Sequence, residues 1–524
     1  MVDDAWQRAD RIMVQKLPIG IQTFSTIRQE NYLYVDKTEA IYRLLTSGIY
    51  FFLSRPRRFG KSLTLSTIKA IFAGERALFK GLWIEERWDW TKIHPVIHFS
   101  FSSIGYKSLG LEAAIEAELR VIGAQMGVQL EESGIARIFR ELIQKLATTT
   151  KVVILIDEYD KPLIDYLEDK AQAHAHQQIL KSFYSVIKDS DPYIEFLLLT
   201  GVSKFSKVSI FSDLNNLSDI TLDRAFADLT GYTQAELLHY FAAYLPATET
   251  LLGLSRTELL EQVRLWYNGY SWDGHVHVYN PFSILSFFQK ADFRNFWFET
   301  GTPTFLLTLM KENRLFALDN LEVNELAFAS YDITRLQILP ILFQTGYLTI
   351  KSKEEFGLYR LGYPNREVEA SMLMYLIGEL GHDEPALTTP MVVHLYRAFR
   401  ANDLAQVIKL IKSIFKNIPS QIFIRDAEAY YHSLIYLVFF YLGQYTQSEV
   451  STNDGRLDCV VQTATHIYIL EFKLDASAAA ALKQIKDRNY HEKYTTDPRP
   501  KVLVGINFSS AKKTVDDWTV ETVK

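Results

Sequence analysis

Three charged side chains near the C-terminus have the types and spacing of a metal-dependent hydrolytic centre. Glu471 and Lys473 interrupt the apolar run "YILEFKL", and Asp458 lies on the preceding predicted strand. Residues two apart on a strand point to the same face of a sheet. Pairing the two strands would bring Asp458 close to Glu471, and two such carboxylates repel each other unless a divalent cation neutralises them. The set could therefore bind Mg²⁺, activate a water molecule and hydrolyse a phosphodiester. A salt-bridged, exposed sheet face is the alternative interpretation.

The elements that must position these side chains follow from the surrounding pattern. Residues 448–475 predict three strands in a meander, because apolar and polar residues alternate between short turns. Helices are predicted over 425–442 and 481–490, and a buried strand over 501–509. Together they predict a small C-terminal α/β domain.

A second set of residues lies near the N-terminus, between a predicted strand and a predicted helix. The strand is "IYFFLS" and the helix "KSLTLSTIKAIF", and Gly60, Lys61 and Ser62 lie at their junction. A glycine-bearing loop that opens a helix can wrap phosphate oxygens with its backbone N–H groups. Lys61 would then reach the terminal phosphates, and Ser62 would bind Mg²⁺.

The loop departs from the usual phosphate-binding pattern, which has a glycine five residues before Gly60. Arg55 occupies that position here, and Arg57 and Arg58 follow it. The three arginines either bind phosphate, with Arg58 as the candidate, or are solvated.

Acidic and polar residues at the ends of two further apolar runs complete this site. The run "KVVILIDEYD" predicts a central parallel strand that ends at Asp157 and Glu158. Ligands bind α/β sheets at the carboxyl ends of the strands, so Asp157 is expected in the Mg²⁺ shell and Glu158 beside the attacking water. The run "IEFLLLTG" places Thr200 at a similar position as a γ-phosphate sensor, with Ser203 as a second choice. Either residue could instead cap the next element.

These segments resemble the bacterial AAA-ATPase-like family. The resemblance rests on "YVDKTEAIYRLL", "FFLSRPRRFGKSLTLSTIKAIF", "ILIDEYDKPL", "TGVSKFSKVSIFSDLNNLSDIT" and "WYNGYSW", and it extends from about Leu17 to the end of the chain. In that family the Arg-Pro-Arg-Arg-Phe-Gly-Lys-Ser form is the usual phosphate loop. Its members usually carry a C-terminal PD-(D/E)XK nuclease domain. The resemblance implies ATP as cofactor with Mg²⁺, or alternatively Mn²⁺.

The C-terminal trio resembles the Asp…Glu-x-Lys signature of PD-(D/E)XK nucleases. The resemblance implies that the preceding helix supplies another metal-binding acid, for which Glu428 is the candidate and Glu449 the competitor. It also implies that Gln484 and Tyr490, on the following helix, steady the site or the nucleic acid.

The middle of the chain carries helical periodicity and then a change of pattern. Residues 335–377 predict a helix that ends at Gly346, two strands around an acidic turn, and a helix that restarts after Pro364. This order is typical of a winged helix. A lid or coupling role is at least as well supported as DNA binding, because the wing has little basic surface. The aromatic residues between 266 and 279 are expected to pack in a core rather than stack on bases.

Length and composition limit the class of protein. The chain has 524 residues, of which 48% are hydrophobic, and a net charge of −6. These values predict several globular domains and argue against a wholly basic nucleic-acid-coating protein. One cysteine excludes an intrachain disulfide, and neither a signal peptide nor a membrane-spanning run is evident. A cytoplasmic protein without membrane contact is expected.

We therefore predict an α/β protein in four parts. They are a P-loop AAA-like ATPase domain, a helical region, a winged-helix-like and helical region, and a restriction-endonuclease-like PD-(D/E)XK domain, over 1–230, 231–333, 334–415 and 416–524 respectively. The predicted function is a nuclease coupled to ATP hydrolysis, with DNA as the preferred nucleic-acid partner and with homo-oligomerisation left open. Defence and DNA processing are the processes considered. The alternative is a signalling ATPase switch whose nuclease-like domain binds without cleaving.

Overall fold

The computed structural model forms two compact units, each discontinuous in sequence. Its described residues are 14–204, 216–297, 304–313, 315–328, 337–381, 384–415, 427–453, 456–512 and 514–523. One unit comprises Met1–Phe305 and Leu318–Val368, and the other comprises Leu306–Ala317 and Glu369–Lys524. The four-part division expected from the order of the motifs stays a prediction.

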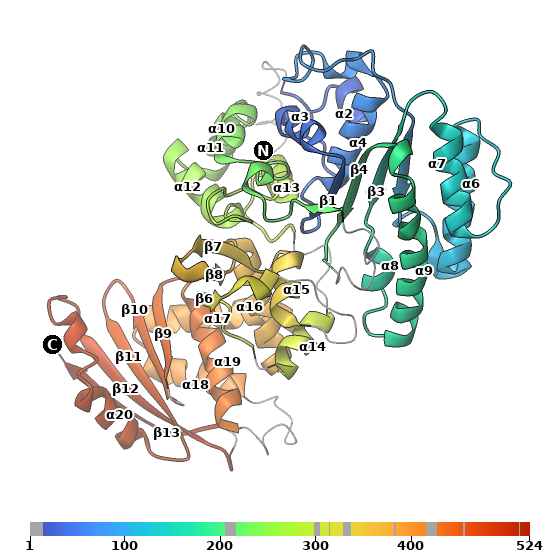
Figure 1. The fold of residues 1–524 in the computed structure, drawn as a ribbon. Helices are drawn as coiled ribbons and strands as arrows, with labels where there is room; N and C mark the ends of the chain where they lie inside the picture. The colour runs from blue at the N-terminus through green and yellow to red at the C-terminus, as the bar shows by residue number, and fades with distance from the viewer. Residues whose placement is uncertain are drawn as a thin grey trace. The chain divides into compact units, whose positions relative to one another are not determined.

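The first unit is built on a parallel five-stranded sheet of order β2-β3-β4-β1-β5 (Figure 1). Its strands are β1 (Tyr50–Ser54), β2 (Val96–Ser100), β3 (Val152–Asp157), β4 (Ile194–Gly201) and β5 (Ser218–Asp219). Every residue of β1 and β3 is buried, as expected for central strands covered on both faces. The order places β4 between β1 and β3. The carboxyl ends of these three strands, which carry the predicted nucleotide-binding residues, therefore lie at one edge of the sheet.

Helices cover both faces of this sheet. They are α2 (Phe24–Gln29), α3 (Thr38–Ser47), α4 (Lys61–Phe72), α5 (Tyr106–Leu109), α6 (Leu111–Gln125), α7 (Ile135–Leu146), α8 (Lys161–Ile164) and α9 (Lys170–Asp189). Apolar residues of α2, α3 and α4 form one core with Phe51 of β1 and Val153 of β3. On β2, the Phe99 ring lies 5.4 Å from that of Phe183 on α9, which stacks on Phe139 of α7.

The remainder of the first unit is mainly helical. Its principal helices are α10 (Gln234–Tyr240), α11 (Leu245–Leu252), α12 (Arg256–Tyr267), α13 (Pro281–Lys290) and α15 (Ile338–Thr345). Thr233 and Ser255 begin α10 and α12 with reciprocal capping boxes. Tyr267, Tyr270, Trp272 and Tyr279 are buried, which confirms that these aromatic residues pack in the core. Within this aromatic segment, Tyr270 and Val278 form an isolated antiparallel bridge.

A small three-stranded sheet follows, in the order β6-β8-β7. Its strands are β6 (Leu321–Val323), β7 (Thr349–Lys353) and β8 (Tyr359–Gly362). Helix α15 ends at Gly346, which takes a left-handed φ of 91°, and α16 (Arg366–Gly381) restarts after Pro364. The predicted order helix, two strands, helix is therefore confirmed, with β6 as an unpredicted third strand. Its assignment as a winged helix stays a prediction.

The second unit contains a mixed five-stranded sheet of order β13-β12-β11-β10-β9. Its strands are β9 (Gln447–Asn453), β10 (Arg456–Gln462), β11 (Ile467–Leu474), β12 (Lys501–Ser509) and β13 (Thr514–Val523). Strands β11 and β12 are parallel, and the other three pairs are antiparallel. The unit also contains α17 (Pro385–Arg400), α18 (Leu404–Ile414), α19 (Ala427–Leu442), α20 (Ala478–Asp487) and most of α14 (Thr304–Glu312) and α16. The predicted meander is confirmed.

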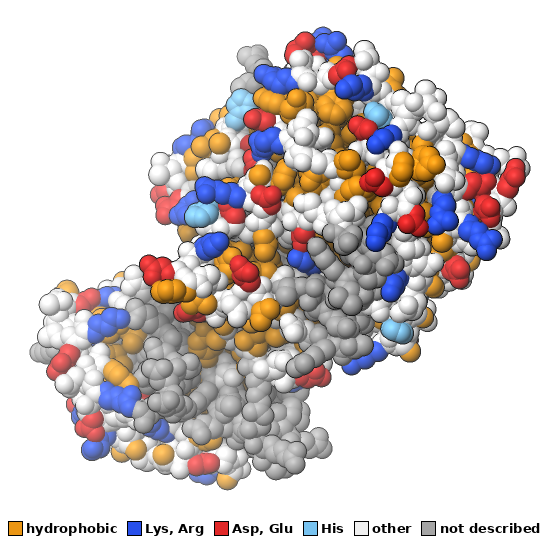
Figure 2. Space-filling view, viewed as in Figure 1, with side chains coloured by type: hydrophobic (Ala, Val, Ile, Leu, Met, Phe, Trp, Pro, Cys, Tyr) orange, Lys and Arg blue, Asp and Glu red, His pale blue; other side chains and the backbone are white. Residues whose placement is uncertain are grey.

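Two surface properties bear on function. In the part of the chain that the structure describes, no helix is both long enough and apolar enough to cross a bilayer. On the face shown in Figure 2, basic and acidic side chains are interspersed over α6 and α7, and ion pairs such as Arg120–Glu116 and Lys145–Glu141 join some of them. These two helices therefore present mixed charge on that face rather than a basic patch.

Candidate nucleotide site and metal-dependent hydrolytic site

The loop between β1 and α4 has the backbone geometry of a phosphate-binding turn. Arg58 and Gly60 both adopt left-handed conformations, with φ of 69° and 91°. Gly60 is the N-cap of α4, and Lys61 is the first residue of the helix. A side chain at φ near 90° would be strained, so glycine suits the point where the loop turns into the helix. The first N–H groups of α4 are then available to an anion.

Lys61 turns back onto its own loop. Its Nζ donates to the carbonyl oxygens of Arg55 at 2.8 Å and Pro56 at 2.9 Å. The side chain is buried, and this burial lowers the pKa of the ammonium against the attraction of Asp157, Asp160 and Glu158. A buried ammonium held by neutral carbonyls is stabilised further by an anionic phosphate, so the site favours such a ligand.

Asp157 links the phosphate loop to the neighbouring strand. Its Oδ2 accepts from the Ser62 hydroxyl at 2.5 Å, and its Oδ1 accepts from the Thr200 hydroxyl at 2.7 Å. The Glu158 N–H also donates to Oδ1, at 3.0 Å, and Glu158 adopts a left-handed φ of 52°. The structure therefore brings Ser62, Asp157 and Thr200 into direct contact, with the half-buried Glu158 beside them.

Asp160 is a buried acid that the sequence analysis did not select. Its Oδ2 accepts from the backbone N–H groups of Val202 at 3.0 Å and Ser203 at 2.6 Å. Burial raises its pKa to about 6, although these N–H groups and Lys61 favour the charged form. Asp160 thus ties the acidic loop after β3 to the segment that follows Thr200. The only sequence signal was a third acid, two residues after Glu158, in the run "DEYD".

The three arginines of the loop have separate environments. Arg55 is completely buried, so it is neither solvated nor placed to contact a phosphate. Arg57 and Arg58 are exposed, and the Arg58 guanidinium lies 4.6 Å from the centroid of the Phe282 ring. Of the two interpretations offered from sequence, neither holds for Arg55. The physical reason is that its guanidinium is bonded within the core, as described below.

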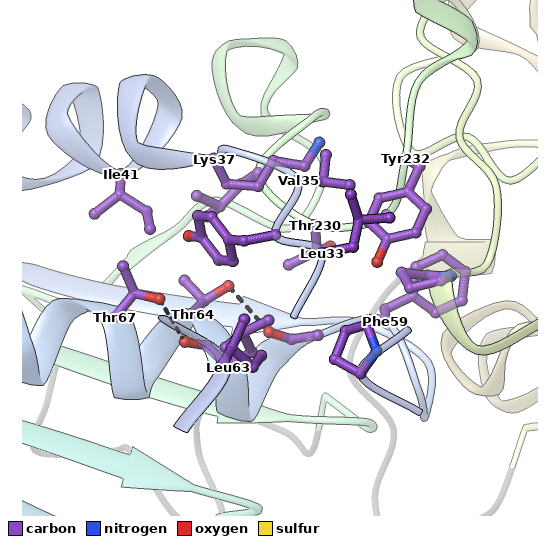
Figure 3. Close-up of a pocket in the computed structure, with 17 residues that line it drawn as sticks. Leu33, Val35, Lys37, Ile41, Phe59, Leu63, Thr64, Thr67, Thr230 and Tyr232 are labelled. Atoms are coloured by element: carbon purple, nitrogen blue, oxygen red, sulfur yellow. Dashed lines mark hydrogen bonds between the residues drawn. The ribbon is translucent and has the colours of Figure 1, made fainter. Parts of the chain in front are cut away.

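A pocket adjoins the phosphate loop (Figure 3). It encloses about 500 Å³ of empty space, including its opening to solvent. Thr64 and Thr67 of α4 face it from one side and Val35 and Lys37 from the other, with Tyr232 at one end. Its apolar walls with a few polar groups resemble the lining of small-ligand pockets.

In the C-terminal sheet, the register brings the expected residues together. Asp458 on β10 is directly opposite Glu471 on β11. Glu471 is completely buried, and neither of its carboxylate oxygens accepts a hydrogen bond from the described residues. Lys473 Nζ lies 3.1 Å from Glu471 Oε1, so the two side chains share a face. A buried carboxylate with open lone pairs is costly unless a cation completes its coordination.

The following helix adds one residue to this face. The Lys473 Nζ donates to Gln484 Oε1 on α20 at 2.5 Å. Tyr490 instead packs against the hydrophobic cluster that contains Ile485 and Leu503, and its hydroxyl accepts from Arg488. The side chains of Asp458, Glu428 and Glu449 lie outside the described residues, so their expected roles as metal ligands stay predictions.

Comparison with known proteins agrees with both sites. A family model described as "Predicted AAA-ATPase" matches residues 18–211, and a model of the PD-(D/E)XK nuclease superfamily matches residues 426–518. A protein of Azotobacter chroococcum mcd 1, "Uncharacterized protein in vnfD 5'region", is 42% identical over 530 residues, covering 97% of this chain and 99% of that protein. The chain belongs to the AAA-ATPase-like family with a C-terminal PD-(D/E)XK domain.

The residues of this AAA-ATPase-like protein fit the groups that its two domain families typically use. Ser62 and Asp157 offer two oxygen donors in contact beside the Lys61 ammonium, which suits a divalent cation next to a phosphate. Glu471 offers a buried carboxylate whose Oε2 has no hydrogen-bond partner among the described residues and whose Oε1 lies 3.1 Å from the Lys473 ammonium, and the backbone of Asp458 lies opposite it. Both sets consist of hard oxygen ligands, which are appropriate to Mg²⁺ or Mn²⁺.

Proposed function

We propose that the protein binds and hydrolyses ATP and that this activity is coupled to divalent-metal-dependent hydrolysis of phosphodiester bonds in nucleic acid, with DNA as the preferred substrate. The observation that carries the nuclease assignment is Glu471, a fully buried carboxylate without a hydrogen-bond partner among the described residues and 3.1 Å from the Lys473 ammonium. A purely structural ion pair would be expected to satisfy those oxygens.

In the nucleotide site, each residue has a distinct task. Lys61 would transfer its hydrogen bonds from the two loop carbonyls to the β- and γ-phosphates. Ser62 and Asp157 would hold Mg²⁺, and Glu158 would orient the attacking water. Thr200, already bonded to Asp157, would respond to the γ-phosphate. We place the base of the nucleotide in the pocket lined by Val35, Thr64 and Tyr232, because it adjoins Gly60 of the phosphate loop.

In the nuclease site, Asp458 and Glu471 would hold the cation, and Glu428 or Glu449 would complete its coordination. A divalent cation bound here would offset the negative charge of the scissile phosphate and lower the pKa of a bound water molecule. Lys473 would position that water and stabilise the charge that develops on the phosphate. Gln484 would fix the Lys473 ammonium through the 2.5 Å bond between them. Tyr490, which packs against the hydrophobic cluster below α20, would steady that helix.

The experiment is cleavage of plasmid and linear DNA, and of RNA, by the purified protein with Mg²⁺ or Mn²⁺. We expect Lys473→Ala to lower the cleavage rate by roughly a hundredfold or more, the order of loss seen when one transition-state donor is removed. Lys483→Ala is the matched control, since Lys483 is an exposed lysine of α20 paired with Asp487. Equal cleavage by the wild type and Lys473→Ala would overturn the assignment.

A second candidate function is a signalling ATPase switch whose nuclease-like domain binds nucleic acid or a protein without cleaving. It is favoured by the absence of a basic excess, since the net charge is −6. It predicts nucleotide-dependent assembly without metal-dependent cleavage, and no effect of Glu471→Ala on any reaction. Defence and DNA processing are the biological settings that we propose for either function.

A further inference from the structure

Arg55 occupies the position at which an ordinary phosphate loop has its first glycine, and it is among the largest fully buried side chains of the molecule. Its guanidinium donates to three main-chain carbonyls, those of Ser54 at 2.9 Å, Thr221 at 2.7 Å and Phe226 at 3.3 Å. The backbone N–H of Arg55 donates to the carbonyl oxygen of Gly201 at 3.1 Å and so extends the pairing of β1 with β4. Because Nη1 and Nη2 donate to backbone oxygens inside the core, while the buried Nε has no partner among the described residues, the guanidinium is held in the core and is not directed at a phosphate.

The opposite side of the guanidinium is covered by an aromatic platform. The Arg55 Cζ lies 4.0 Å from the centroid of the Trp272 ring, and Trp272 is itself buried. Phe59, in the same loop, packs edge-on against Tyr270 at 4.7 Å and Trp272 at 5.4 Å. Two residues of the segment 270–279 therefore contact the phosphate loop at two places. Trp272 stacks on Arg55, and both Tyr270 and Trp272 pack against Phe59.

Arg55 is also linked directly to the lysine that is expected to bind phosphate. Its carbonyl oxygen, together with that of Pro56, accepts the hydrogen bonds of the Lys61 ammonium. Pro56 is tightly packed in turn, since a Cβ added at Gly346 would lie 2.8 Å from the Pro56 ring. Removing Lys61 from these carbonyls therefore changes the hydrogen bonding of the two residues that rest on Trp272 and on the end of α15.

We propose that Arg55 is a positioning residue that holds the phosphate loop on Trp272, and that Trp272 senses whether the Lys61 ammonium is bonded to the loop or to a nucleotide. This inference rests on the proposed function, in that Lys61 must bind the nucleotide phosphates. It gives the arginine a role that a glycine cannot fill. A glycine makes the loop pliable, whereas Arg55 anchors it to three carbonyls and one indole ring.

The first experiment measures tryptophan fluorescence on addition of MgATP, with binding measured separately by calorimetry. We expect the wild type to bind and to change its emission. Trp272→Phe should still bind but lose most of that change. Trp83→Phe is the control, because the half-buried Trp83 makes the same type of contact with an exposed arginine, Arg87, whose Cζ lies 4.3 Å from the centroid of the indole ring. An undiminished change in Trp272→Phe would overturn the inference. Failure of the wild type to bind MgATP would instead overturn the proposed function.

The second experiment compares Arg55→Lys with Arg87→Lys. Lysine keeps the charge but cannot reproduce a planar set of donors to three carbonyls while it stacks on the indole ring. We expect Arg55→Lys to weaken MgATP binding by roughly tenfold or more, which corresponds to loss of one or two hydrogen bonds to a charged group. Arg87→Lys should bind as the wild type does. If Arg55→Lys lowers the unfolding temperature but binds MgATP with unchanged affinity, the role of Arg55 is structural and the inference is wrong.

Discussion

Lys61 shows how one residue can be poised for a ligand by its surroundings. Its ammonium is buried with two carbonyl acceptors, and desolvation lowers its pKa. A phosphate would relieve that cost more fully than the carbonyls do, because its negative charge is opposite to that of the buried ammonium. The same burial makes Lys61 a sensitive target for substitution.

We expect Lys61→Met to weaken MgATP binding by roughly ten- to a hundredfold, because a charge-assisted hydrogen bond contributes about 1.5–3 kcal/mol. Methionine keeps most of the stem volume and removes only the ammonium. Lys69→Met, at an exposed position near the end of the same helix, should bind normally. Calorimetric titration with MgATP measures both, and equal affinities would contradict the role given to Lys61.

Asp160 makes a pH-dependent contribution to stability. Burial raises its pKa from 3.8 to about 6, so the folded chain holds this proton more tightly than the unfolded chain does. The associated stability is fully present below about pH 3.8 and is lost as the pH rises through about 6. A shift of this size corresponds to about 3 kcal/mol.

Asp160→Asn should therefore remove a decline in unfolding free energy between pH 4 and 6, while the amide oxygen still accepts from Val202 and Ser203. The measurement is chemical denaturation of both proteins across this range. Other groups also titrate there, so the difference between the two curves is the relevant quantity. Parallel curves would show that Asp160 does not titrate as expected.

Sequence patterns were sufficient for the residues whose roles follow from local order. Lys61 and Ser62 begin a helix after a buried strand, and Asp157 ends another, so their convergence followed from parallel-sheet topology. Arg55 was misread because its environment is made by Trp272, which is distant in the chain. Asp160 was missed because the residues next to it in the sequence do not indicate that its carboxylate accepts hydrogen bonds from the backbone of Val202 and Ser203.

At the scale of elements, alternation and apolar runs predicted β10, β11 and the pairing of Asp458 with Glu471. Strand β13 was not anticipated, because half of "TVDDWTVETV" is exposed and only Val515 is buried, so this edge strand has little apolar signal. Strand β5 has only two residues and offers no pattern. Elements that bury one or both faces are therefore predictable, and elements held mainly by backbone pairing are not.

Helix α20 depends on one glycine for its approach to the sheet. A Cβ added at Gly505 of β12 would lie 2.2 Å from Ala478 O and 2.7 Å from Leu482 N of the helix. Gly505→Ala should therefore push α20 outward and move Gln484 away from Lys473. Overpacking of this kind costs about 1–3 kcal/mol.

For Gly505→Ala we expect weaker hydrogen-exchange protection of α20 and slower nucleic-acid cleavage, with ATP hydrolysis unchanged. Ala479→Leu is the control, since it adds a larger group to the exposed side of the same helix. Unaltered protection in Gly505→Ala would mean that the helix tolerates the methyl group. The close approach of α20 to Gly505 would then not be what holds Gln484 beside Lys473.

At the scale of the whole molecule, the chain joins an AAA-ATPase-like domain to a PD-(D/E)XK nuclease-like domain, and the proposed function gives the two sites the same kind of cation but different substrates. Each site has its own core and its own polar network, and the contacts described above are all internal to one unit or the other. Coupling between the sites is therefore a property to be measured rather than read from either site. The two candidate functions differ in what the nucleotide site controls, which is nucleic-acid cleavage in the first and assembly without cleavage in the second.

If nucleotide binding controls the nuclease, the effects of single substitutions should be asymmetric. Lys61→Met should abolish ATP hydrolysis and also lower nucleic-acid cleavage, whereas Lys473→Ala should abolish cleavage and leave ATP hydrolysis within roughly twofold of the wild type. The physical reason is that the Lys473 ammonium contacts Glu471 and Gln484, both of which belong to the same unit as Lys473. Parallel assays of both reactions in the two variants, with Lys69→Met and Lys483→Ala beside them, measure this. Full cleavage by Lys61→Met would mean that the sites act independently, and cleavage by neither the wild type nor any variant would favour the non-cleaving switch.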